Sequence, residues 1–251
     1  MSRIGFLGTG HIAAPMVRFL ASKGHEVNVS ERGADVARDL EASVGANIME
    51  NQDVVDRSDI VFLCLRPAMW EGIVTPLDFR KQQRVISVMA NVAIEDIKRA
   101  IAPASDVSVT VPIGFLERGG CPLPAYPSSD LIEALFGPEN PVIALNTEEQ
   151  MADFFAASAL LSAVLTVMKD GADWLGEQIE NPSGADTYYA SLMAGFLRDV
   201  PKDGQGRILE ARSGLATPNT LNRAVVDAME GADTRSVVRE VLDRLSRGMK
   251  G

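Results

Sequence analysis

The sequence predicts an α/β fold in which a doubly wound parallel sheet is followed by an all-helical C-terminal domain. Apolar runs alternate with helix-like stretches over residues 4–111, and a glycine-rich turn follows the first of these runs. Beyond about residue 145, almost every segment has the composition and spacing of a helix. Strands that alternate with helices form parallel sheets with right-handed crossovers, which accounts for the first part of this prediction.

Apolar runs predict the strands of the sheet at residues 4–7, 25–29, 60–65, 84–89 and 107–111. The run at 60–65 is apolar almost throughout, which is typical of a central parallel strand buried on both faces. Helices are predicted at 11–23, where apolar residues recur on one face, and at 34–44.

The glycine-rich turn indicates a Rossmann-type dinucleotide site. An apolar strand leads into Gly8-x-Gly10-x-x-Ala13, which opens a helix, and this is the context in which the pattern carries that meaning. Gly8 permits the tight turn, Gly10 lets the backbone approach a pyrophosphate, and Ala13 lets the helix pack on the strand. The N-terminus of the helix then faces the phosphates. The remaining predicted cofactor contacts of this turn are Thr9, His11 and Ile12.

The ends of the second and third predicted strands complete the expected cofactor site. The second ends on Ser30-Glu31-Arg32, where an acidic residue binds the ribose of NAD and an arginine accommodates the 2′-phosphate of NADP. Glu31 would repel that phosphate and Arg32 would attract it, so the residues favour NADP and leave NAD as the alternative. A solvated Glu–Arg pair on the surface is the other interpretation. The third strand, residues 60–65, leads into the turn Leu65-Arg66-Pro67 at the same edge.

The second half of the chain predicts a separate helical domain. Proline-rich loops at residues 122–141 precede a long helix over 148–178 that is apolar on more than one face. Such a helix needs cover on several sides, as in a bundle core or a dimer interface. A loop at 181–184, a helix around 188–197 and further helices after Pro218 follow. We expect a dinucleotide-binding domain at 1–145 and a helical dimerisation and substrate domain at 146–251.

Composition excludes several classes of function. The formal net charge of −10 argues against nucleic-acid binding, which relies on a basic surface. The two cysteines have no metal-type spacing, and Cys64, inside an apolar run, is interpreted as a small buried hydrophobe. No Gly-x-Ser-x-Gly elbow supports a hydrolase. No signal peptide is visible and no apolar stretch was found to reach a bilayer's width, so we expect a cytoplasmic protein without a membrane partner.

The motifs resemble known families. Residues 4–32 resemble the start of both the pyrroline-5-carboxylate reductases and the β-hydroxyacid dehydrogenases. Farther on, residues 64–67, Cys-Leu-Arg-Pro, are similar to the Ala-Val-Lys-Pro turn of the reductases, and residues 86–91 to their Ile-Ser-Ile-Ala-Ala-Gly. Val111-Pro112 matches their Met-Pro. This resemblance implies an NAD(P)H-dependent oxidoreductase of the imine reductase class, which transfers a hydride to a small imine or ketone and forms a homodimer through its C-terminal helices.

The substrate motifs of the reductases are absent, which predicts a different substrate. Residues 154–160 replace their Ser-Gly-Ser-Gly-Pro, and residues 218–222 replace their Pro-Gly-Gly-Thr-Thr. The sequence identifies no catalytic residue and no metal site. The polar candidates to orient a substrate are Ser158, Asn219, Thr220 and Asn222. Asn219 and Thr220 lie where turn or cap chemistry would also use them.

Three alternatives to an imine or ketone reductase remain. A β-hydroxyacid-type dehydrogenase would use a helix lysine as proton donor, and Lys169 is the candidate. The simpler interpretation of Lys169 is an ion pair with Asp173, four residues on. The second alternative is a non-catalytic nucleotide-sensing protein, and the third is a deazaflavin-linked NADP reductase, whose N-terminal pattern is the same.

Overall fold

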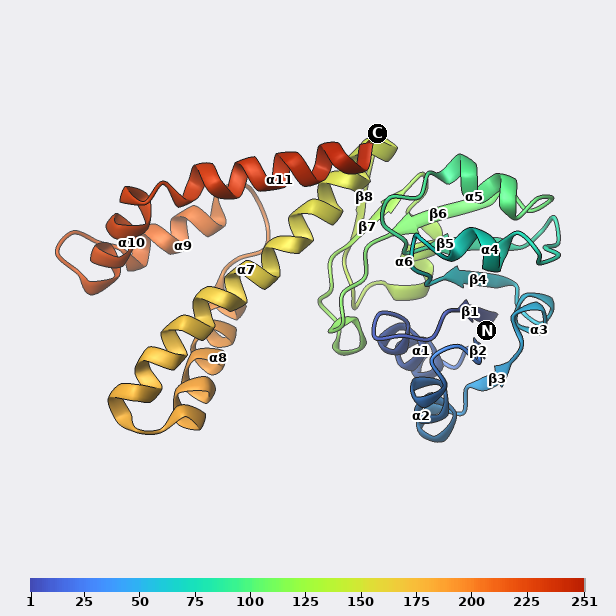
Figure 1. The fold of residues 1–251 in the computed structure, drawn as a ribbon, viewed down its shortest axis with the longest axis horizontal. Coiled ribbons are helices and arrows are strands. Elements are labelled where there is room, and N and C mark those ends of the chain that lie inside the picture. Colours follow the sequence, from blue (N-terminus) through green and yellow to red (C-terminus); the bar gives the residue numbers. More distant parts are fainter. Residues whose placement is uncertain (251) are drawn as a thin grey trace. The chain divides into compact units, whose positions relative to one another are not determined.

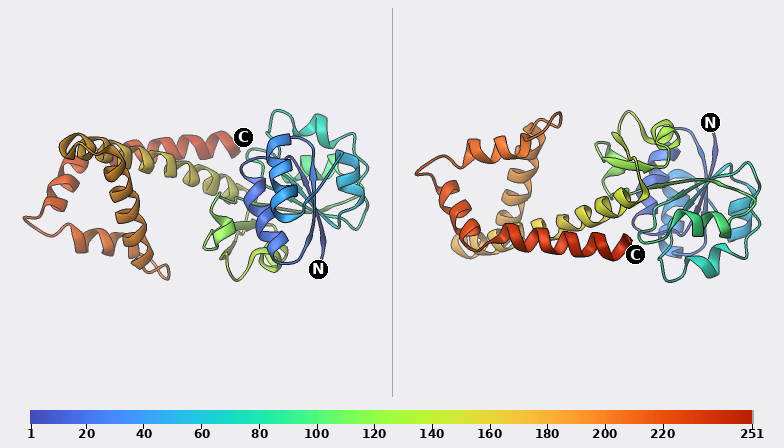
Figure 2. Two further views of the ribbon diagram at one scale, coloured as in Figure 1. Left: turned by 90° about the horizontal axis from the view of Figure 1, so that it is seen from below. Right: turned by 90° about the horizontal axis from the view of Figure 1, so that it is seen from above.

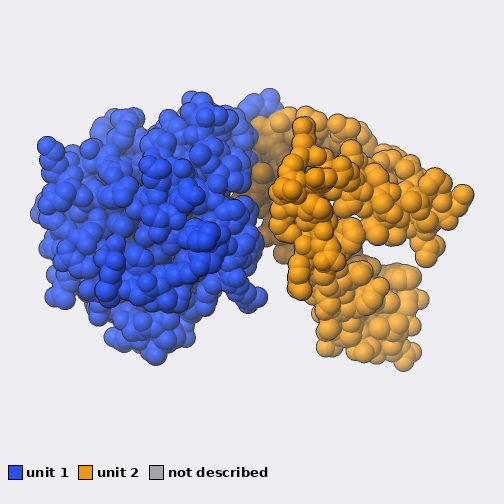
Figure 3. Space-filling view, turned by 180° about the vertical axis from the view of Figure 1, so that it is seen from behind, with its two compact units in different colours: residues 1–155, 246–251 blue, residues 156–245 orange. Residues whose placement is uncertain are grey.

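The computed structural model describes residues 1–250. The chain forms two compact units, shown in different colours in Figure 3. Unit 1 contains Met1–Phe155 and the described residues from Ser246 onward, and unit 2 contains Ala156–Leu245. The boundary expected near residue 145 thus lies inside unit 1, and the end of the chain belongs to unit 1 as well.

Unit 1 is built on one eight-stranded sheet in the order β3-β2-β1-β4-β5-β6-β7-β8 (Figure 1). Its neighbouring strands are parallel, except that β6 and β7 are antiparallel. The predicted α/β fold is therefore confirmed, with one antiparallel pair added. The strands are β1 (Arg3–Leu7), β2 (Glu26–Ser30), β3 (Asn47–Met49), β4 (Ile60–Leu63), β5 (Arg84–Ser87), β6 (Asp106–Thr110), β7 (Leu123–Tyr126) and β8 (Val142–Ala144).

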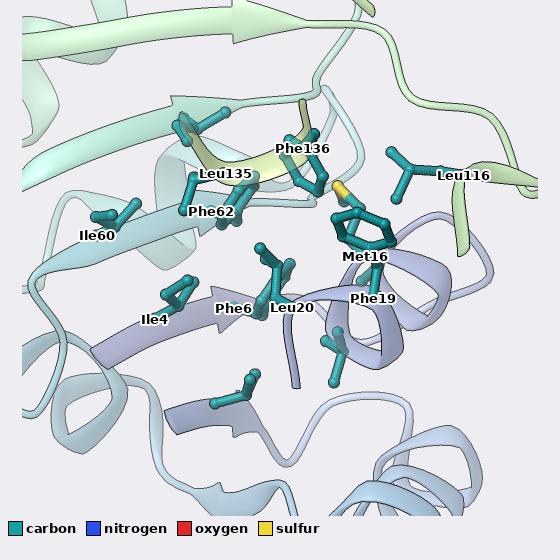
Figure 4. Packing of buried hydrophobic residues seen from close by; sticks show 14 of the residues in the cluster. Ile4, Phe6, Met16, Phe19, Leu20, Ile60, Phe62, Leu116, Leu135 and Phe136 are labelled. Atoms are coloured by element: carbon teal, nitrogen blue, oxygen red, sulfur yellow. The ribbon is translucent and has the colours of Figure 1, made fainter. Parts of the chain in front are cut away.

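Helices cover both faces of this sheet. α1 (Ala13–Ser22), α2 (Ala34–Val44) and α6 (Asp130–Phe136) contribute to the apolar cluster on one face, drawn in part in Figure 4. The rings of Phe6 and Phe62 stack there with centroids 4.6 Å apart. α3 (Asn51–Asp56), α4 (Trp70–Val74) and α5 (Ile94–Ala100) pack on the other face, and η1 (Leu116–Arg118) follows β6. Both faces of the sheet are therefore covered by apolar side chains, as expected of parallel strands.

Unit 2 consists of helices (Figure 2). They are α7 (Glu148–Ile179) and α8 (Pro182–Asp199), followed by α9 (Arg207–Leu215), α10 (Leu221–Gly231) and α11 (Thr234–Lys250), of which α7 begins and α11 ends in unit 1. The loop expected at 181–184 is instead the start of α8, because the Asn181 side chain accepts a hydrogen bond from Gly184 N and Pro182 occupies the first turn.

Unit 2 buries few of its own residues. Within residues 156–245, burial is confined to the small residues Ala156, Ala172, Gly176 and Ala185. Large apolar side chains lie exposed along its helices, among them Leu161, Val164, Leu165, Val167, Trp174, Ile179, Leu192, Leu221, Val225 and Val237. The long helix is thus apolar on more than one face, as predicted, and much of its apolar surface is exposed in the described residues.

α7 also corrects one expectation. Its 32 residues contain an 18-residue window of mean hydropathy 1.8, of which 17% is buried, so by length and composition it could cross a membrane. The expectation that no segment is long and apolar enough to cross a bilayer is therefore wrong as far as length and composition go. The same composition belongs to a helix covered by other protein, so by itself it is weak evidence for a membrane.

Candidate functional site

The turn between β1 and α1 is shaped by glycines that have no room for a side chain. Gly8 has φ +93°, and a Cβ on it would lie 2.4 Å from the Cys64 carbonyl oxygen. Gly33, at the start of α2 with φ +87°, would place a Cβ 2.0 Å from the carbonyl oxygen of Thr9. Backbone segments from β1, β2 and β4 therefore meet at this point, which is the carboxyl edge of the sheet.

Buried polar side chains lock the turn in place. Gly8 N donates to Ser30 Oγ at 2.9 Å, and Thr9 Oγ1 donates to the Ser30 carbonyl oxygen at 2.8 Å. Thr9 N donates to the Arg32 carbonyl oxygen at 3.2 Å. Thr9 and Ser30 are almost fully buried, so these two predicted site residues hold the loop and present little surface to a ligand.

Gly10 differs from its neighbours because open space lies before it. A Cβ on Gly10 would meet nothing within 4 Å, and His11 and Ile12 beside it are exposed. α1 then begins at Ala13, which is fully buried against the sheet, and no side chain caps this helix end. An uncapped helix N-terminus beside open space is suited to bind an anionic group.

The residues that follow β2 and β4 beside this turn are charged and exposed. Glu31, Arg32 and Arg66 all lie at the surface, and Arg32 Nη2 lies 3.7 Å from Met69 Sδ. Leu65 is buried beneath this edge, whereas Pro67 is exposed. Arg32 of the β2 turn and Met69 of the β4 turn thus come together. Sequence reasoning did not identify Met69 or Gly33, because both act through contacts across the fold.

These residues fit a dinucleotide. The space before Gly10 and the uncapped start of α1 would hold the pyrophosphate, and Glu31, Arg32 and Arg66 would surround the adenosine ribose. When bound in reduced form, such a cofactor supplies a hydride.

The predicted substrate residues lie in unit 2 and have structural partners. Thr220 caps α10: its Oγ1 accepts from Arg223 N at 3.2 Å and donates to the Thr217 carbonyl oxygen at 2.7 Å. Asn219 has φ +62°, a left-handed conformation that turns favour. Asn222 Nδ2 donates to the Leu215 carbonyl oxygen at 3.4 Å, and Ser158 is half-buried on α7. Asn219 and Thr220 therefore have the turn and helix-cap roles that were the other interpretation of these two residues.

The two remaining candidates for chemistry have unsuitable environments. Lys169 forms an exposed ion pair with Asp173, and this pair raises the pKa of the lysine, whereas a general acid needs a lowered one. Burial raises the pKa of the Cys64 thiol, which disfavours the nucleophilic thiolate.

The chain is similar to known proteins in part of its sequence and in its fold. Residues 3–91 match the family model of the NADP oxidoreductases that are coenzyme F420-dependent. No curated protein sequence matches the chain significantly. Among solved structures, the 1-pyrroline-5-carboxylate reductase of Streptococcus pyogenes has a TM-score of 0.82 at 15% identity, over 99% of this chain and 98% of that one.

The fold is shared throughout the chain. The pyrroline carboxylate reductase of Plasmodium falciparum, solved with NADP bound, has a TM-score of 0.82 at 12% identity, over 99% of this chain and 97% of that one. The chain has the fold of these reductases. An imine reductase from Pseudomonas sp. is less similar, with a TM-score of 0.62 at 16% identity, over 97% of this chain and 87% of that one. The resemblance inferred from the motifs is thus confirmed in the fold.

Proposed function

We propose that this chain is an NAD(P)H-dependent oxidoreductase that transfers a hydride to a small imine or ketone. One observation carries the proposal: the space before Gly10 opens onto the uncapped start of α1, at the carboxyl edge of a parallel sheet. In open α/β sheets, ligands bind in the crevice at this edge. The match of residues 3–91 to an NADP oxidoreductase family and the fold shared with pyrroline-5-carboxylate reductases support redox chemistry there.

The test is oxidation of NADPH in the presence of candidate acceptors. We expect absorbance at the reduced nicotinamide band to fall when a cyclic imine is added, and ketoacids form the second arm of the screen. The reductase proposal fails if neither acceptor class accelerates NADPH loss while NADPH binding is intact. That result would leave a nucleotide-sensing protein.

We propose NADP as the preferred cofactor, because Arg32 and Arg66 both lie exposed at the edge that the adenosine ribose would meet. Arg32→Ala should weaken NADPH binding by roughly tenfold, the loss of one charge-assisted contact, and leave NADH binding nearly unchanged. Glu31→Ala is the matched control, which should not weaken NADPH. Calorimetric titration measures both. Tighter binding of NADH than of NADPH by the unaltered protein would reverse the preference.

A second candidate function follows from the family model itself. Its description names a coenzyme F420-dependent NADP oxidoreductase, so a reduced deazaflavin is a candidate partner for hydride exchange with NADP. Adding the oxidised deazaflavin to the screen as a hydride acceptor from NADPH separates an imine or ketone reductase from this second function. Turnover with the deazaflavin and none with imines or ketoacids would favour this second function.

We further propose a homodimer formed through the C-terminal helices, in the cytoplasm. The support for the dimer is the exposed apolar surface of unit 2, which a second copy would cover. Cell fractionation tests the location.

A further inference from the structure

Unit 1 contains a cavity on the face of the sheet opposite α1. Its volume is about 460 Å³, within the range of roughly 300–1,000 Å³ typical of small-molecule sites. Met89, Val109 and Met151 line it and belong to the apolar cluster on the α5 face, whereas α1 packs into the cluster on the other face. The cavity is therefore separate from the glycine turn.

The floor of the cavity is apolar and polarisable. Met89 follows β5, Val109 lies on β6, Tyr126 ends β7, and Met151 and Phe155 come from the start of α7. Aromatic faces and thioether sulfurs both interact favourably with organic cations and with the rings that carry them.

Two glutamates at the rim of the cavity, Glu148 and Glu149, carry negative charge that is available to a ligand. Glu148 Oε1 accepts a hydrogen bond from Ile94 N at 2.8 Å. Hydrogen bonds from its own backbone N–H and from Thr147 hold the pKa of Glu149 below its usual value. Neither glutamate takes part in an ion pair among the described residues.

The other charges of the rim are already matched. Lys250 Nζ lies 2.6 Å from Asp153 Oδ1, so the cation that lines the cavity is paired. Asp96 forms an ion pair with Arg99. Lys250 also attracts Glu149, but the two glutamates outnumber it, so the rim of the cavity carries more negative than positive charge.

We propose that this cavity binds a small organic cation, a protonated amine carried on an apolar or aromatic ring. The ammonium group would lie between Glu148 and Glu149, and the ring would lie on the floor formed by Tyr126, Phe155 and the methionines. The same carboxylates repel an anion of equal size. The proposal goes beyond hydride transfer and does not depend on it.

The probe is benzylammonium, titrated into the full-length protein and followed by ligand-observed NMR. Glu149→Gln should weaken binding at least about fivefold, and the double variant with Glu148→Gln should weaken it further, because glutamine keeps an acceptor for Ile94 N and loses the charge. Glu177→Gln, an exposed site on α7 in unit 2, is the matched control and should bind as the unaltered protein does. Benzyl alcohol should bind more weakly than benzylammonium, and benzoate should not bind. Equal binding by the glutamine variants, or binding of benzoate, overturns the proposal.

Three further measurements locate the site. Ala152 lines the cavity and is buried, so Ala152→Leu should fill the space and abolish benzylammonium binding, with circular dichroism to check the fold. If that variant does not fold, the glutamine variants still decide. Saturating NADPH should not displace benzylammonium, and Gly10→Val should leave its affinity unchanged. Displacement by NADPH would place the amine in the crevice and refute a separate site.

Discussion

The glycines at the carboxyl edge of the sheet differ in what surrounds them, although Gly8 and Gly10 belong to one sequence pattern. Gly8 and Gly33 are pressed against backbone carbonyl oxygens, while Gly10 faces open space. The pattern Gly-x-Gly-x-x-Ala predicted the turn and the buried Ala13 because those requirements are local. It could not predict that Gly33 touches Thr9, or that Met69 meets Arg32, because those contacts join segments that only the folded sheet brings together.

Gly8→Ala should destabilise the protein. The left-handed φ of +93° and the 2.4 Å approach to the Cys64 oxygen both oppose a Cβ, so we expect a loss of at least about 2 kcal/mol in the free energy of unfolding. Urea denaturation followed by circular dichroism measures it. Gly72→Ala, at an exposed position where a Cβ has no neighbour within 4 Å, is the control. Equal stability of the two variants would refute this account of the turn.

At the scale of elements, the central apolar strands and the long helices were predictable, whereas the strands nearer the edges of the sheet were not. The predicted helix at 34–44 coincides with α2, and the helix predicted at 148–178 differs from α7 by one residue. β7 and β8 were missed because they lie in the proline-rich region, where Pro124 and Pro141 indicate loops. The long apolar helix α7 was predicted from its composition, but composition does not identify which residues pack against it.

The end of α11 is attached to α7 through Asp153. Hydrogen bonds from Lys250 and Ser246 lower the pKa of this carboxyl from its ordinary 3.8. A lowered pKa contributes stability that is complete above the ordinary value and is lost as the pH falls through the folded-state value.

Asp153→Asn should therefore lower the melting temperature at pH 6 and make less difference at pH 3, because the stabilisation is lost progressively as the pH falls below the ordinary pKa of 3.8. Differential scanning calorimetry across this range measures the difference. Asp170→Asn, an exposed position on the same helix, should show no such trend. A destabilisation that is the same at both pH values would mean that charge is not what attaches the helix end.

For the whole molecule, the two units differ in how they are stabilised. Unit 1 has two large apolar clusters, one on each face of its sheet. The buried residues of unit 2 are small, and its large apolar side chains face outward. An exposed apolar surface of this size is typical of an interaction site, and the resemblance to the reductases implies a second copy of the chain as the partner.

We expect a dimer in detergent-free buffer, measured by light scattering after size-exclusion chromatography. Leu165→Glu, at a site 52% exposed on α7, should shift the protein to a monomer because it places a charge in the interface. Ile143→Glu, at a site 39% exposed on β8 in unit 1, should leave the dimer intact. A monomeric unaltered protein, or one that stays in solution only with detergent, would contradict the dimer and direct attention to a membrane.

The central claim is that a dinucleotide binds over the first loop, and calorimetric titration of NADPH into the unaltered protein and Gly10→Val tests it most directly. The valine has room in the free protein, since a Cβ on Gly10 meets nothing within 4 Å. The variant should therefore melt as the unaltered protein does. Its side chain would occupy the space of the pyrophosphate, so NADPH affinity should fall at least about 50-fold, which corresponds to roughly 2.3 kcal/mol. NADPH binding that is unchanged by the valine, or absent from the unaltered protein, would contradict the claim.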